Sequence, residues 1–131
     1  MRTGELLLEA YGRLPGIIER AVAGLAPEQL VWAPAGGANT IGWLVWHLTR
    51  IQDHQVAQVR EEDQVWDATW AARFGIGADT EETGYAHTPE QVAAVRPESA
   101  QALLDYYGAV AARTNEFLET VTDDGLDRVV D

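Results

Sequence analysis

The sequence has 131 residues, which is enough for one domain with its own hydrophobic core. Its 21 acidic and nine basic residues give a net charge of −12, and such a surface repels phosphate backbones, so we expect no nucleic-acid partner. The apolar stretches are too short to span a bilayer, the N-terminus lacks the pattern of a signal peptide and the chain has no cysteine, so we expect a cytoplasmic protein without membrane segments, disulfide bonds or a catalytic cysteine.

The first predicted helix covers about residues 3–24, because apolar residues recur there at the three- and four-residue steps of a helix. These residues are Leu6, Ala10, Leu14, Ile17, Ala21 and Leu25. The pair Pro15–Gly16 interrupts the pattern and predicts a kink or two shorter helices. Residues 26–40 are predicted to connect this helix to the next one, with Asn39 or Thr40 as the N-cap.

The second predicted helix covers about residues 41–61. Its expected core stripe consists of Ile41, Leu44, Val45, Leu48, Ile51 and Val59. His47 and His54 are seven residues apart and point within about 20° of each other, on a flank of that stripe that also carries Trp43 and Arg50. Side chains on such a flank face either a neighbouring helix or a cleft between helices.

Residues 62–89 are predicted to form a long, mostly irregular stretch with a short helix at about Asp67–Phe74. Aromatic residues recur there at four-residue steps from Trp66 onward, so we expect the stretch to fold back onto the bundle. The capping sequence Thr88–Gln91, with proline at its second position, then predicts a short helix that ends near Val95.

The third long helix is predicted over about residues 97–121, on the most regular apolar stripe of the chain. The stripe consists of Ala100, Leu103, Leu104, Tyr107, Val110, Ala111, Thr114, Phe117, Leu118 and Val121. The residues Thr122–Gly125 predict a stop and a solvated turn. The sequence therefore predicts one all-α domain over residues 1–131 with three long helices, although four is the commoner number in a bundle of this size.

Histidine is the commonest metal ligand, but His47 and His54 are separated by about 10.5 Å along the helix axis and are badly placed to share one ion. Two ligands on one helix are usually four residues apart. The helix therefore offers one good ligand. The alternative interpretation, which the spacing alone favours, is that both histidines are partly buried and bonded to backbone or carboxylate groups.

Trp43 and Trp46 flank His47 in a chain that contains five tryptophans. For any single tryptophan, core packing is the simpler interpretation, but their concentration around His47 favours a walled pocket. The third histidine, His87, precedes the proline of the short-helix cap, and by itself it is more typical of a surface or hydrogen-bonded residue than of a ligand.

The stretch Asn39–His54, NTIGWLVWHLTRIQDH, resembles a signature of the DinB-like helical-bundle superfamily. The stretches Thr83–Arg96, TGYAHTPEQVAAVR, and Asp124–Asp131, DGLDRVVD, look like the branch related to mycothiol-dependent maleylpyruvate isomerase and to uncharacterised DinB-like proteins of mycothiol-using bacteria. The resemblance covers most of the chain, and the combination of motifs is more specific than the first motif alone.

The resemblance implies an up-down four-helix bundle that holds a divalent metal, usually zinc or nickel. One ligand is the histidine of the tryptophan-rich second helix, which is His47 here, and two more lie four residues apart on the last helix of the family. This sequence ends at Asp131, before that helix would begin. His54, His87 or an acidic residue of a second subunit are then the candidates for completing the metal site.

The resemblance also implies a transferase or isomerase that depends on a thiol cofactor, in which the metal lowers the pKa of a bound thiol or water. Trp43 and Trp46 would form the walls of its cofactor-binding pocket. Asp53 or His54 would contact His47 and not the metal itself. The thiol would come from a small molecule such as mycothiol, because the chain has no cysteine. The alternatives are a non-catalytic binding or interaction module that has lost the metal site, and a purely structural oligomer.

Three amphipathic helices would leave an apolar groove in the place of a fourth helix. A large exposed apolar surface favours burial against a partner, so we expect a homo-oligomer, most simply a dimer. A small apolar molecule is the alternative occupant of the groove.

Overall fold

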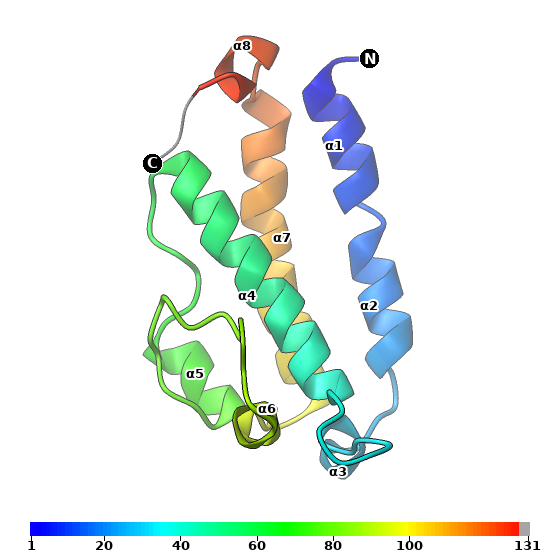
Figure 1. The fold of residues 1–131 in the computed structure, drawn as a ribbon. Helices are drawn as coiled ribbons and strands as arrows, with labels where there is room; N and C mark the ends of the chain where they lie inside the picture. Colours follow the sequence, from blue (N-terminus) through cyan, green and yellow to red (C-terminus); the bar gives the residue numbers. More distant parts are fainter. Residues whose placement is uncertain (129–131) are drawn as a thin grey trace.

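The computed structural model describes residues 1–128, and every regular element in that range is a helix (Figure 1). In chain order the helices are α1 (Thr3–Tyr11), α2 (Leu14–Val22), α3 (Pro27–Leu30), α4 (Ile41–Arg60), α5 (Ala68–Phe74), α6 (Pro89–Ala94), α7 (Ala100–Thr120) and α8 (Asp123–Leu126). The predicted all-α fold class is confirmed. Within these residues, no helix combines the length and the hydrophobicity that crossing a membrane requires.

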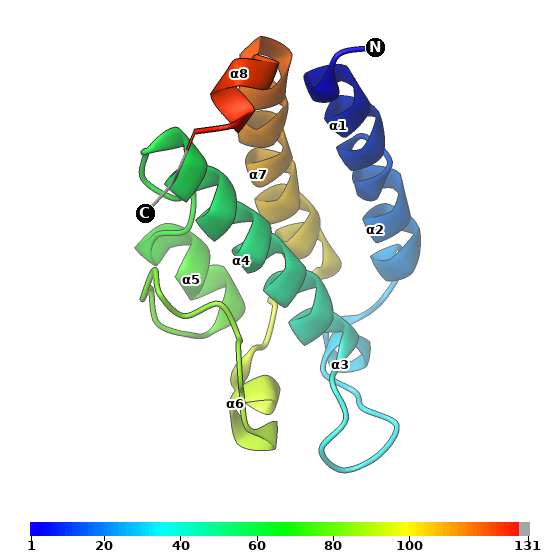
Figure 2. The same ribbon diagram turned by 45° about the horizontal axis from the view of Figure 1, so that its top comes forward.

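The first long rod consists of α1 and α2, which follow each other along one side of the molecule (Figures 1 and 2). The prediction of two shorter helices is confirmed, but the break lies at Gly12 and Arg13 and not at Pro15–Gly16. Pro15 stands in the first turn of α2, where a missing backbone N–H removes no helical hydrogen bond. The proline therefore helps to start the second helix and does not break the first.

Helix α7 is the central element, because α1, α2, α4 and α5 all pack against it. In both views α1 and α2 lie on one side of it and α5 on the other, with α4 crossing it (Figures 1 and 2). Ser99 caps α7 by accepting a hydrogen bond from the backbone N–H of Ala102. The buried face of α7 contains half of the predicted stripe, namely Leu103, Tyr107, Val110, Thr114 and Leu118, and adds Ala102 and Tyr106, which the prediction omitted.

Side-chain caps start most of the remaining helices at the predicted places. Thr40 caps α4, Asp67 caps α5 and Thr88 caps α6, each by accepting from a backbone N–H three residues further on. Thr122 does the same for α8, so the residues predicted as a stop and turn form a short helix instead. The capping hydroxyl and the two acidic residues in the first turn favour this last helix.

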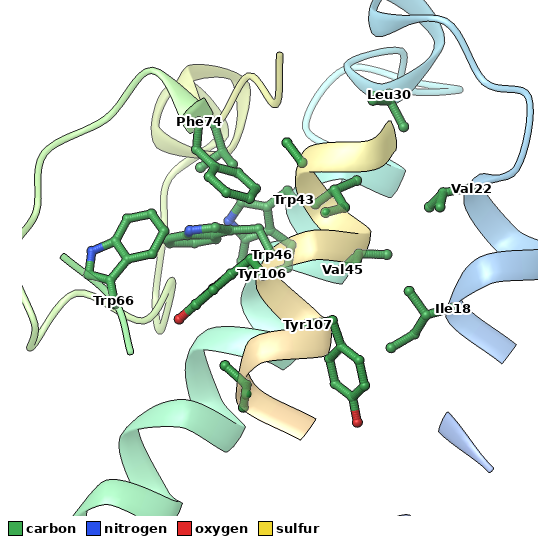
Figure 3. Close-up of a cluster of buried hydrophobic side chains, with 14 of the residues drawn as sticks. Ile18, Val22, Leu30, Trp43, Val45, Trp46, Trp66, Phe74, Tyr106 and Tyr107 are labelled. Atoms are coloured by element: carbon green, nitrogen blue, oxygen red, sulfur yellow. The ribbon is translucent and has the colours of Figure 1, made fainter. Parts of the chain in front are cut away.

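The hydrophobic core extends on both sides of α4 and α7 (Figure 3). On the side of α2 it contains small aliphatic residues, including Ile18, Val22 and Leu30. On the other side it is aromatic, and its largest members are Trp43, Trp46, Trp66, Phe74 and Tyr106. The irregular stretch after α4 supplies Trp66 and Phe74, which confirms that this stretch folds back onto the bundle.

The predicted core stripe of α4 is wrong for three of its residues, which are exposed. Ile41, Leu44 and Leu48 expose 37%, 45% and 37% of their surface, whereas Val45 is buried. The buried face carries aromatic and polar residues instead, namely Trp43, Val45, Trp46, Thr49, Arg50, Gln52, Asp53 and Ala57. This face is covered because α7 and the stretch after α4 supply hydrogen-bond partners for its polar groups.

Among residues 1–128 the long rods are α1–α2, α4 and α7, so the prediction of three long helices is confirmed. Helices α1, α4 and α7 enclose a mostly apolar groove of about 220 Å³. Its walls include Leu7, Val56, Val59, Phe117 and Leu118.

Candidate functional site

The N-terminal half of α4 carries the tryptophans and the histidine that the sequence singled out. Trp43 and Trp46 are buried, and His47 is partly exposed. Because residues four apart lie one above the other on a helix, the rings of Trp43 and His47 stack, with centroids 4.5 Å apart and planes inclined by 16°. The helix therefore presents one imidazole that an indole ring holds in place.

The loop Thr80–Thr88 lies on this part of α4 and fixes the His47 ring. The Nδ1 atom of His47 is 2.5 Å from the carbonyl oxygen of Thr83. A carbonyl oxygen only accepts hydrogen bonds, so Nδ1 carries the proton and Nε2 of the neutral ring has a free lone pair. Within the described residues Nε2 has no hydrogen-bond partner.

His87 joins the same cluster in the opposite tautomer. The indole Nε1–H of Trp43 donates to Nδ1 of His87 at 3.0 Å, and Nε2 of His87 is 2.8 Å from a carboxylate oxygen of Glu82. Since an indole only donates and a carboxylate only accepts, the proton of the neutral His87 ring is on Nε2. The ring also stacks on Trp46 at 5.7 Å. Both nitrogens of His87 are thus already bonded within the protein.

His54 lies away from the other two histidines, as its spacing from His47 predicted. Its Nε2 is 3.5 Å from a carboxylate oxygen of Glu81, and its ring borders an open, mainly polar hollow of about 630 Å³. The structure therefore brings Trp43, Trp46, His47 and His87 together but leaves His54 apart.

The residues described here do not form a complete metal site. Nowhere in residues 1–128 do three or more histidine, cysteine, aspartate or glutamate side chains lie where they could hold one ion. A catalytic zinc needs about three protein ligands. His47 has a free ring nitrogen, whereas His87 could bind a metal only by breaking a hydrogen bond.

Arg50 holds the loop against α4, a role that the sequence analysis missed. Its guanidinium is fully buried and donates to the carbonyl oxygens of Thr80 at 2.9 Å and Glu82 at 3.1 Å, and to the side-chain oxygen of Gln64 at 2.7 Å. The planar fork of an arginine suits it to several acceptors at once. The sequence did contain a sign of this role, because Arg50 and Asp53 are the only aspartate, glutamate, lysine or arginine residues of α4 before Arg60.

Asp53 ties the segment after α4 to the bundle. Its carboxylate accepts from the backbone N–H groups of Val65 and Trp66, both at 2.8 Å, and from the hydroxyl of Tyr106 at 2.6 Å. It also forms a buried ion pair with Arg50 at 3.4 Å. Burial and the nearby Asp53 carboxylate raise the pKa of Tyr106, so the phenol stays protonated and donates. None of the hydrogen bonds or ion pairs of Asp53 involves His47, although the resemblance implied that Asp53 contacts that residue.

Comparisons with known proteins agree with this architecture. Residues 10–131 match the family described as the DinB superfamily. A crystal structure described as that of the conserved protein of locus from Enterococcus faecalis has a TM-score of 0.87 and 28% sequence identity to this chain. The match covers 100% of this chain and 78% of that one. Among curated proteins, none matches this sequence.

Proposed function

Because this chain belongs to the DinB superfamily, we propose that His47 is one ligand of a divalent metal, zinc or nickel, in a thiol-dependent transferase or isomerase. The observation that carries the proposal is the hydrogen bond from His47 Nδ1 to the carbonyl oxygen of Thr83. Metal-binding histidines typically donate their other ring N–H to a carbonyl or a carboxylate, which fixes the tautomer and aims the free nitrogen. His47 has this arrangement.

We further propose that a second subunit supplies the remaining ligands, because no three histidine, cysteine, aspartate or glutamate side chains of residues 1–128 lie where they could hold one ion. The thiol comes from a small cofactor such as mycothiol, since the chain contains no cysteine. Such a ligand would meet His47 first, because Trp43 and Trp46 are both buried. On the sequence motifs alone, we propose that the chain belongs to the branch of the superfamily related to mycothiol-dependent enzymes.

Zinc titration of the purified chain, followed by calorimetry, tests the role of His47. We expect His47→Ala to weaken zinc binding by at least about tenfold, because the loss of an outer-shell partner of a ligand alone costs 10–100-fold. His54→Ala is the matched control, because it removes a histidine of the same helix that lies apart from the cluster. Equal zinc affinities for the wild type and both variants would contradict the proposal.

A second candidate function is a non-catalytic module that binds a small apolar molecule. The groove between α1, α4 and α7 favours this candidate, because its walls are mainly apolar. The two candidates differ in their dependence on His47, which does not line the groove. Binding of an apolar probe that Val56→Glu abolishes and His47→Ala leaves intact would support the second candidate.

We also propose that the chain forms a homodimer through the exposed stripe of α4, defined by Ile41, Leu44 and Leu48. From Ile41 to Gln58 the one acidic residue of α4 is Asp53, and it is buried. A net charge of −12 opposes the approach of two copies through most surfaces, but the stripe itself carries no carboxylate. Contact between the stripes of two copies would bury apolar surface without that repulsion between carboxylates.

Sedimentation velocity at tens of micromolar tests the dimer. We expect the wild type to sediment as a dimer and Leu44→Glu to weaken association by about 2 kcal/mol or more, the size of an interface hot spot. Leu6→Glu is the control, because Leu6 on α1 is even more exposed but lies outside the stripe. A wild-type chain that stays monomeric at this concentration would contradict the proposal.

A further inference from the structure

The peptide group between Thr83 and Gly84 is held at both of its polar ends. Its N–H donates to a carboxylate oxygen of Glu82 at 3.1 Å, and its carbonyl oxygen accepts from His47. In a trans peptide the N–H and the C=O point in opposite directions, and residues 1–128 contain no cis bond. When Glu82 holds the N–H, the carbonyl is therefore directed at the imidazole.

Arg50 fixes the chain immediately before this peptide. Its guanidinium binds the carbonyl oxygens of Thr80 and Glu82, and the side-chain amide of Gln64 donates to the Thr80 oxygen as well, at 2.9 Å. Arg50 is fully buried one turn beyond Trp46 on α4, so it ties the loop to the same helix that carries His47. Loop and imidazole are thereby positioned on one rigid element.

Gly84 permits the close approach of the loop to the imidazole. A Cβ atom at this position would lie 2.8 Å from Nδ1 of His47 and 2.9 Å from the ring of Trp46. The residue also has φ +95°, a conformation that side chains rarely adopt. Any other residue would therefore lift the Thr83 carbonyl away from His47.

We propose that Arg50 and Gly84 are positioning residues that hold the Thr83 carbonyl on His47 and so keep the imidazole proton on Nδ1. The lone pair on Nε2 is then available to a metal or another electrophile. This inference rests on the proposed function for its biological meaning. Its test uses the metal-free chain, so a failure of the metal proposal would not be confused with a failure of this one.

The test is the two-bond ¹⁵N–¹H correlation spectrum of the metal-free, labelled chain near pH 9, where imidazole is ordinarily neutral. We expect the proton of His47 on Nδ1 and that of His87 on Nε2, which gives each spectrum an internal reference of the opposite tautomer. A wild-type spectrum with the His47 proton on Nε2 would overturn the inference without the need for any variant.

Two variants test the positioning residues. In Gly84→Ala we expect the His47 signals to shift toward the Nε2–H tautomer and zinc affinity to fall by about 10–100-fold. The matched control is Gly77→Ala, because a Cβ at Gly77 would meet no atom within 4 Å. Arg50→Lys keeps the charge but loses the planar fork of the guanidinium, and we expect the same tautomer shift provided that circular dichroism shows a folded chain.

His47 signals in Gly84→Ala that match the wild type would overturn the inference. A tautomer shift with unchanged zinc affinity would support it and contradict the metal role of His47.

Discussion

Replacement of Asp53 by alanine should lower the free energy of unfolding by about 3–5 kcal/mol, because it leaves the charge of Arg50 buried without a counter-charge. The variant also removes the acceptor for the backbone N–H groups of Val65 and Trp66 and for the hydroxyl of Tyr106. Buried donors that lose their acceptor keep the full cost of their desolvation. Urea unfolding followed by tryptophan fluorescence measures the effect.

The matched control is Asp63→Ala, which removes a carboxylate from an exposed position of the same region. Substitutions at such surface positions usually change stability by no more than about 0.5 kcal/mol. Similar losses in the two variants would show that Asp53 and its ion pair with Arg50 do not hold the segment after α4.

Replacement of Trp46 by alanine should also cost about 3–5 kcal/mol, because the side chain is fully buried between Trp66 and the ring of His87. Its indole N–H has no partner in the described residues, so the loss reports packing alone. Trp32→Ala is the control, since Trp32 is 66% exposed. Thermal unfolding by circular dichroism compares the two. A Trp46→Ala variant as stable as Trp32→Ala would mean that the aromatic cluster rearranges to fill the space.

The positions of the helices could be predicted from the sequence because their determinants are local. The hydrophobic period located α4 and α7 to within a few residues, and Thr40 and Thr88 capped helices where the sequence indicated. The break between α1 and α2 was misplaced, because Pro15 is compatible with the first turn of a helix as well as with a break.

The buried face of α4 could not be predicted from periodicity. Leu44 and Leu48 are more hydrophobic than Arg50 and Asp53. A prediction from apolar residues alone therefore buries the face of the helix that is in fact exposed. The observed orientation is favourable only because partners such as Tyr106 supply hydrogen bonds from 53–56 residues away in the chain.

The candidate site was predicted in part. The sequence placed Trp43, Trp46 and His47 together. The alternative of histidines bonded to backbone or carboxylate groups describes His47 and His54, and His87 is hydrogen-bonded as its own prediction stated. The approach of His87 to Trp43 depends on the path of a loop between them, and no local pattern specifies that path. The role of His47 as a ligand stays a prediction.

The buried guanidinium of Arg50 has a consequence for the folding cooperativity of the irregular stretch. Its partners come from α4, from the segment after it, from the loop and from α7. If the loop opened alone, the guanidinium would lose two of its carbonyl acceptors while still largely surrounded by protein. Such opening is therefore coupled to wider unfolding, and the loop behaves as part of the stable core and not as a mobile lid.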